Sequence, residues 1–148
     1  MLEPWYVTGI CEGEAAFTYN RASNYSINLY FAIKLRADDK NLLSQVKDFF
    51  GVGKLYLVKG KLLGRFSGNT QPAAYYRVNK INEIARITEH FDKYALAGKK
   101  LKQYQIWREI YYLKKQYNKT LYPKVWELLK EMSTLTSKNT TSRTKRDG

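Results

Sequence analysis

The chain has 148 residues, a formal net charge of +13, and 44% hydrophobic and 15% aromatic residues, enough for a buried core in one domain. The cationic surplus and the 13 tyrosines favour a nucleic-acid partner over a lipid surface. The single cysteine, Cys11, excludes an internal disulfide, and no Cys/His spacing is typical of a zinc site.

No stretch reaches the length of a membrane span, and the N-terminus lacks the cationic start of a targeting peptide. We therefore expect a soluble, intracellular protein with no membrane partner. Organelle and prokaryotic cytoplasm are not distinguishable from these residues.

The first predicted helix runs from about Pro4 to Glu14. Proline suits the first turn of a helix, and the residues that follow repeat at spacings of three and four. Gly9 and Gly13 are poor helix formers, each costing roughly 1 kcal/mol against alanine. Close packing against another helix would recover that cost.

From Phe17 the hydrophobic period changes to two, which predicts two strands of a hairpin joined by a turn at Arg21–Asn24. One face carries Tyr25, Ile27, Leu29, Phe31, Ile33 and Leu35; the other carries Ser26, Asn28, Tyr30, Lys34 and Arg36.

The helical period then resumes in DDKNLLSQVKDFFGVG, with Asp38 or Asp39 as N-cap and Gly51 as the stop. A second hairpin follows in KLYLVKGKLLGRFSGNTQPAAYYRVN. Three helices are predicted after it, in NKINEIARITEHF, KKLKQYQIWREIYYLKKQ and PKVWELLKEM. The pattern indicates one domain over residues 1–133 and a basic, polar tail over residues 134–148.

The charges are partitioned between these elements. Both hairpins contain lysine and arginine but no acid, whereas most acids lie on the helices. Two acid-free hairpins are typical of a sheet face that meets phosphate, although strands disfavour Asp and Glu in any case. A generic basic protein such as a ribosomal subunit is the alternative explanation of the total charge.

The element order and the segment VTGICEGEA (Val7–Ala15) resemble the LAGLIDADG homing endonuclease family. FAIKLRADDKNLLSQVKDFFGVGKLY and HFDKYALAGKKLKQYQIW also resemble that family, so the likeness covers about residues 5–110. It implies an α/β (α+β) fold of order αββαββα, in which a saddle-shaped antiparallel sheet carries its helices on the opposite face. The implied activity is that of an intron-encoded DNA endonuclease, which makes a double-strand break with 3′ overhangs at a long pseudo-palindromic target.

The motif glycines predict the partner of the first helix. Gly9 and Gly13 lie four residues apart on one helix face, where a second helix could approach closely. Because the chain carries one copy of the motif, we expect a homodimer through this helix. Ordinary internal packing of the same face is the alternative.

The resemblance assigns Glu14 to the eighth motif position, where the family has its metal-binding carboxylate. A carboxylate at a helix C-terminus is disfavoured by the helix dipole, and a divalent cation removes that penalty. Hard oxygen ligands favour Mg²⁺, with Mn²⁺ as substitute, and the carbonyl of Gly13 is implied as a further ligand. Glu12 is interpreted as structural, and Cys11 as core.

The same resemblance implies a cation near the scissile phosphate. Lys99 is the first candidate and Lys100 the second, with ordinary phosphate contact as the alternative for both. Leu35 stands where many relatives have a glutamine, and Arg36 or Gln71 are unproven substitutes for it. Ala15 replaces the final glycine of the motif.

Outward strand positions are expected to contact DNA, and Asn suits adenine whereas Arg or Lys suits guanine. These positions are Thr18, Asn20, Asn24, Ser26, Asn28, Tyr30, Lys34 and Arg36 in the first hairpin, and Lys54, Tyr56, Lys59, Lys61, Arg65, Tyr75 and Arg77 in the second.

A second hypothesis has the same fold and charge but no nuclease activity. In it the chain is an RNA-binding maturase that assists splicing of its own intron, with intron RNA as partner in place of double-stranded DNA. Glu14 favours the nuclease, because an RNA-only role does not require a metal-binding carboxylate.

Overall fold

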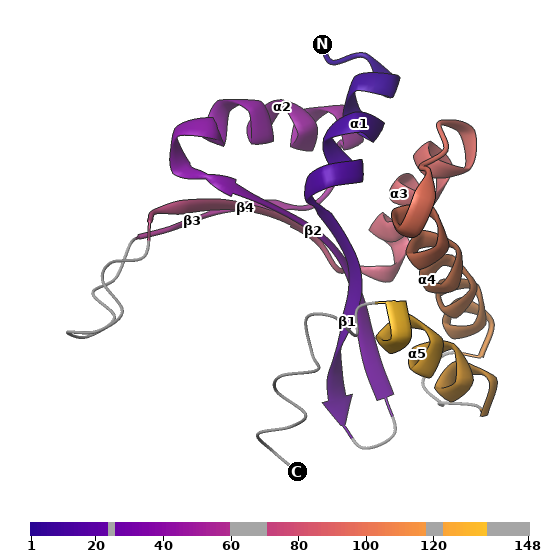
Figure 1. The fold of residues 1–148 in the computed structure, drawn as a ribbon. Coiled ribbons are helices and arrows are strands. Elements are labelled where there is room, and N and C mark those ends of the chain that lie inside the picture. The colour runs from indigo at the N-terminus through magenta and orange to yellow at the C-terminus, as the bar shows by residue number, and fades with distance from the viewer. Residues whose placement is uncertain (24–25, 60–70, 118–122, 136–148) are drawn as a thin grey trace. The chain divides into compact units, whose positions relative to one another are not determined.

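The computed structural model describes residues 1–23, 26–59, 71–117 and 123–135 (Figure 1). The elements are α1 (Pro4–Glu14), β1 (Ala15–Ser23), β2 (Ser26–Arg36), the 3₁₀ turn η1 (Ala37–Asp39), α2 (Lys40–Phe50), β3 (Lys54–Val58), β4 (Ala73–Val78), α3 (Ile81–Lys93), α4 (Gly98–Tyr117) and α5 (Pro123–Leu135). This confirms the predicted order αββαββα, which two more helices follow. Within the described ranges, no helix is both long and apolar enough to cross a bilayer.

One local prediction differs from the structure, and another is confirmed in position only. β1 continues through Ser23, so the turn predicted to begin at Arg21 is wrong over Arg21–Ser23. Asp39 does occupy the N-cap of α2, but its side chain makes no capping hydrogen bond, because η1 already leads the chain into the helix. The predicted contacts Asn24, Lys61 and Arg65 lie outside the described residues, as do residues 136–148 of the predicted tail.

The four strands form one sheet in the order β1-β2-β4-β3, and β4 pairs antiparallel with both β2 and β3. The two registers align residues of one face across three strands: Arg77 of β4 lies between Ala32 of β2 and Lys54 of β3. The next row joins Lys34, Tyr75 and Tyr56 in the same way. The predicted alternation along β2 is confirmed, since Ile27, Leu29, Phe31 and Ile33 are buried.

The chain forms two compact units. The first comprises Met1–Tyr19 with Leu29–Leu96, and the second comprises Asn20–Asn28 with Ala97–Gly148. In the second unit α4 packs on α5 through apolar side chains that include Trp107, Ile110, Val125, Leu128, Leu129 and Met132. Here the guanidinium carbon of Arg21 lies 4.7 Å from the ring centre of Trp126, which joins the end of β1 to α5.

The core of the first unit is aromatic. The ring centre of Phe31 lies 5.3 Å from that of Phe17, 5.8 Å from that of Phe50 and 6.0 Å from that of Phe91. These rings join β1, β2, α2 and α3, and such pairs add stability beyond the area that they bury. Nearby, the Tyr76 hydroxyl donates to the Val52 carbonyl at 2.7 Å, and burial raises the pKa of this phenol.

A buried histidine connects α3 to α1. Thr8 Oγ1 donates to the carbonyl of Tyr94 at 2.9 Å and lies 2.9 Å from Nε2 of His90. Because the threonine proton is already used, Nε2–H of His90 is the donor in the second bond. The imidazole packs against Phe49, Phe50 and Phe91, and burial lowers its pKa from 6.5 to about 4. The bond to Thr8 and the surrounding rings give His90 a structural role between α3 and α1.

We predict a pH-dependent stability from this site. The folded state favours the neutral form of His90. The contribution of this group to the free energy of unfolding is therefore fully present above pH 6.5 and is lost as the pH falls from 6.5 toward 4. Chemical denaturation at a series of pH values measures the effect. The free energy of unfolding of His90→Gln should depend less on pH in that window, and an identical pH dependence in both proteins would contradict the assignment.

Candidate functional site

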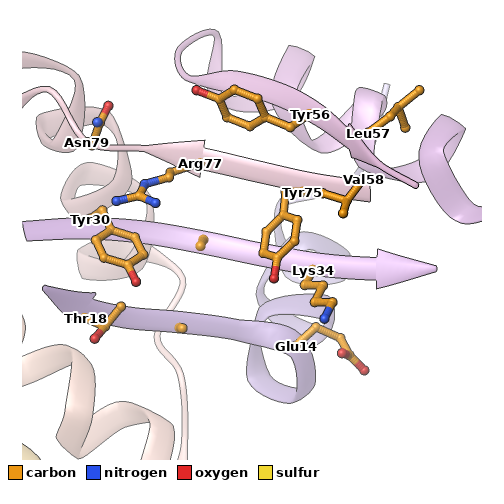
Figure 2. A pocket seen from close by; sticks show the side chains of 12 residues that line it. Glu14, Thr18, Tyr30, Lys34, Tyr56, Leu57, Val58, Tyr75, Arg77 and Asn79 are labelled. Carbon is orange, nitrogen blue, oxygen red and sulfur yellow. The ribbon is translucent and has the colours of Figure 1, made fainter. Parts of the chain in front are cut away.

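A groove of about 720 Å³ lies on the sheet face of the first unit, and Figure 2 shows the side chains that line it. The end of α1 and all four strands contribute, so the floor of the groove is made by neighbouring strands of one sheet. The lining residues are Glu14, Ala16, Thr18, Tyr30, Ala32, Lys34, Tyr56, Leu57, Val58, Tyr75, Arg77 and Asn79.

The acid in this groove is Glu14, and its position follows from the junction of two elements. α1 ends at Glu14, and β1 begins at the next residue without an intervening loop. The side chain of Ala15 is buried in the core, whereas the side chain of Glu14 is exposed beside the groove. Glu12 is half-buried and does not line the groove; its structural role stays a prediction.

The cations and aromatic rings of the groove are paired. The guanidinium carbon of Arg77 lies 3.7 Å from the ring centre of Tyr30, and the Lys34 ammonium lies 5.5 Å from that of Tyr75. Figure 2 shows Lys34 at the Glu14 end of the groove and Arg77 with Tyr30 toward the other end. The surface thus combines positive charge, flat rings and one carboxylate.

The residues present fit half of a divalent-metal site. Glu14 offers an exposed carboxylate, and the carbonyl of Gly13 adjoins it at the end of α1. Across the described ranges, no group of three or more His, Cys, Asp or Glu side chains gathers in a way that could hold a metal. Mg²⁺ is usually held by one or two carboxylates together with waters and substrate phosphates, so the Glu14 carboxylate and the Gly13 carbonyl fit part of such a site.

Seven of the predicted contact and catalytic residues share this groove. They are Glu14, Thr18, Tyr30, Lys34, Tyr56, Tyr75 and Arg77. Lys54, Lys59 and Arg36 are exposed in the first unit but do not line it, and the Arg36 guanidinium lies 3.7 Å from the Asp38 carboxylate.

Other predicted residues belong to the second unit. Asn20, Ser26 and Asn28 lie on the hairpin in that unit, and Lys99 and Lys100 lie in the first turn of α4. The roles of these residues stay predictions. Leu35 is partly buried on the sheet face that carries Ile33, so its side chain does not line the groove; Gln71 is exposed just before β4.

Several lining residues were not predicted. Ala16 and Ala32 share the outward face of their strands but carry no polar group that would mark them as contacts. Alternation alone could have found Ala32, because it lies between Tyr30 and Lys34 on the same face. Val58 and Asn79 could have been found in the same way, since they lie two residues beyond the predicted contacts Tyr56 and Arg77, whereas Leu57 carries no such signal.

The motif glycines lie on an open face of α1. Gly9 and Gly13 are exposed, and a β-carbon added to either would meet no atom within 4 Å, leaving aside the backbone of the helix itself. Trp5 and Tyr6 of the same helix are also exposed, at 61% and 53%. Within the described residues, then, no side chain packs against α1 at Gly9 and Gly13, although the Trp5 ring meets that of Tyr94 edge-on at 5.2 Å.

Comparisons with known proteins bear on the same elements. The chain is 28% identical over 116 residues to an uncharacterized 50.9 kDa protein in ND4 intron 1 of Podospora anserina. The aligned region covers 73% of this chain and 23% of that protein. The chain is 27% identical over 118 residues to probable intron-encoded endonuclease 3 of Neurospora crassa, covering 76% of this chain and 20% of that protein. The chain thus spans about a quarter or less of these curated relatives.

Solved structures share the fold. The LAGLIDADG meganuclease I-AabMI bound to uncleaved DNA matches with a TM-score of 0.69 and 25% identity, over 90% of this chain and 43% of that one. The homing endonuclease I-LtrWI bound to target DNA matches with a TM-score of 0.73 and 22% identity, over 89% of this chain and 43% of that one. In both cases less than half of the neighbour is matched.

The family model of the LAGLIDADG endonucleases matches residues 7–111. That range begins within the glycine-bearing helix, includes Glu14 and every strand of the sheet, and ends in α4. Because the match covers most of the chain, we conclude that this protein belongs to the LAGLIDADG endonuclease family.

Proposed function

We propose that this chain is the DNA-binding and DNA-cutting half of a homing endonuclease. The observation that carries the proposal is the position of Glu14, which ends the glycine-bearing helix at the margin of a groove whose other charged lining residues are Lys34 and Arg77. A duplex is a polyanion whose major groove admits a two-stranded β-ribbon, so the sheet face has the charge and the shape to enter it.

Each group in the site has a proposed task. Lysine and arginine side chains would neutralise phosphates, while side chains on the floor of the groove would meet base edges. Glu14 and the carbonyl of Gly13 would hold Mg²⁺, or Mn²⁺ in its place. When bound, this ion supplies Lewis-acid polarisation of the phosphate and activates a water for in-line attack. Lys99 or Lys100 would stabilise negative charge that develops on the scissile phosphate.

A double-strand break requires two such sites. One chain supplies one Glu14, and the open glycine face of α1 is the surface through which a second copy would approach. A symmetric pair of chains would then present two carboxylates to a pseudo-palindromic target. We propose cuts across the minor groove that leave 3′ overhangs.

A substitution on the glycine face tests this association. Gly9→Leu adds a side chain where the chain itself has open space, and leucine is a better helix former, so the folded monomer should be at least as stable as wild type. Sedimentation should show a dimer for wild type on a palindromic duplex and a monomer for Gly9→Leu. Gln105→Leu, at an exposed position of α4, is the matched control and should leave the dimer intact. A wild-type monomer, both free and on DNA, would contradict the proposal.

Competition between DNA and RNA tests the choice of partner. We expect the 148-residue chain to bind selected duplexes at least about a thousandfold more tightly than scrambled ones, with affinity falling steeply between about 50 and 200 mM salt. Equal binding of all duplexes, together with selective binding of folded intron RNA, would favour the maturase instead.

A further inference from the structure

The stacked pair Arg77 and Tyr30 joins the two central strands of the groove floor. Tyr30 belongs to β2 and Arg77 to β4, and the guanidinium carbon lies 3.7 Å from the tyrosine ring centre. At that separation the guanidinium lies over the tyrosine ring, and Figure 2 shows the two side chains next to each other. An arginine held in this way loses less rotational freedom when it binds a ligand than a freely extended one does.

The neighbours of Arg77 do not neutralise it. Its cross-strand partners on the same face are Ala32 and Lys54, and neither side chain accepts a hydrogen bond. Nε of Arg77 is buried and has no hydrogen-bond partner in the part of the chain that the structure describes. Glu14 lies toward the other end of the groove in Figure 2. The side chain is therefore positioned by stacking.

The burial of Nε restricts how Arg77 can meet a ligand. With Nε covered, the two terminal amino groups are the donors that remain for a ligand in the groove. Guanine presents two adjacent acceptors, O6 and N7, at the floor of the major groove, whereas adenine presents one acceptor beside a donor. A fork of two donors matches guanine and is mismatched with adenine.

A phosphate could also accept such a fork, but the place of Arg77 in the sheet favours a base edge. Arg77 is half-buried on a central strand, while Lys54 beside it is exposed on the edge strand β3. When a sheet lies in the major groove, its central strands face the base edges and its margins face the phosphates.

We propose that Arg77, positioned by Tyr30, reads a guanine at one base pair of the DNA bound by each chain. The inference rests on the proposed DNA-binding function and adds the identity of one recognised base. Lys54 is assigned the contrasting role of a phosphate contact that does not discriminate between bases.

To test the inference, duplexes are selected from a random pool by their binding to the full chain. Wild type should select G·C at one position, and Arg77→Lys, which keeps the charge but loses the fork and the stack, should lose about 5- to 150-fold of that preference. Other positions should keep their preferences. Tyr30→Phe retains the ring and should keep the preference for G·C at that position, whereas Tyr30→Ala should relax the same position as Arg77→Lys does.

Two controls separate the outcomes. Lys54→Ala should weaken all duplexes alike and lower the salt slope by about one, without changing any base preference. Replacing the selected guanine by 7-deazaguanine removes N7 and should weaken the binding of wild type more than that of Arg77→Lys. The result for wild type does not depend on how the variants fold. If Arg77→Lys weakens every duplex equally, or if 7-deazaguanine changes nothing, the inference is wrong while the proposed function stands. If wild type selects no sequence at all, the proposed function fails too.

Discussion

Glu14→Gln is expected to lose DNA cleavage while it retains DNA binding. The substitution keeps the size of the side chain but removes the charge that a divalent cation requires. Removing a residue that hydrogen-bonds to a metal ligand typically lowers metal affinity or activity about 10- to 100-fold. Removing the ligand itself should therefore lower the cleavage rate at least about 100-fold. Glu14 is exposed, so the fold should not depend on it.

The measurement is the single-turnover cleavage rate of a selected duplex in Mg²⁺, paired with the affinity for that duplex in the absence of Mg²⁺. Glu12→Gln is the matched control, since it alters the neighbouring carboxylate of the same helix, which does not line the groove. We expect Glu12→Gln to keep most of the cleavage rate. A Glu14→Gln protein that cuts at the wild-type rate would exclude the mechanism.

Gly53→Ala is expected to destabilise the first unit by about 2 to 5 kcal/mol, the sum of a left-handed backbone penalty and overpacking. Gly53 has φ +89°. A β-carbon there would lie 2.6 Å from Cε1 of Tyr76, 2.8 Å from the carbonyl oxygen of Arg77 and 2.8 Å from Cγ2 of Val78. Since these atoms belong to the central strand β4, relief of the clash would move β3 away from β4 and disturb the groove.

Gly51→Ala provides the comparison for this prediction. Gly51 is also left-handed, with φ +73°, but a β-carbon there meets nothing within 4 Å. Its substitution should therefore cost only the backbone term, about 1 to 2 kcal/mol. Free energies of unfolding from urea titration measure both variants, and equal losses would show that the close approach at Gly53 is not the cause.

The order of the elements was predictable because each has a strong local pattern. The two-residue period from Ile27 to Ile33 marks a strand with one buried face, and Gly51 ends α2 in the left-handed conformation that favours glycine. The turn at Arg21 was misplaced, because polar residues such as Ser and Asn suit turns while Arg21 is fixed by its contact with Trp126 more than 100 residues away.

The site was only partly predictable for a related reason. Strand alternation gives the face on which Tyr30 or Arg77 lies, but the pairing of β2 with β4 decides that the two stack. The bond between Thr8 and His90 likewise joins residues 82 positions apart, beyond the reach of any local pattern. Lys99 and Lys100 belong to the other compact unit, and their catalytic role stays a prediction.

We propose that the site formed by Glu14 and the groove beside it cuts both strands of a DNA duplex. Sequencing the ends of fragments after a random duplex library is incubated with the 148-residue chain and Mg²⁺ tests it most directly. We expect paired cuts with 3′ overhangs at related, pseudo-palindromic sites, and we expect these cuts to disappear with Glu14→Gln. A library left intact by wild type, or cut equally well by Glu14→Gln, would contradict the proposal.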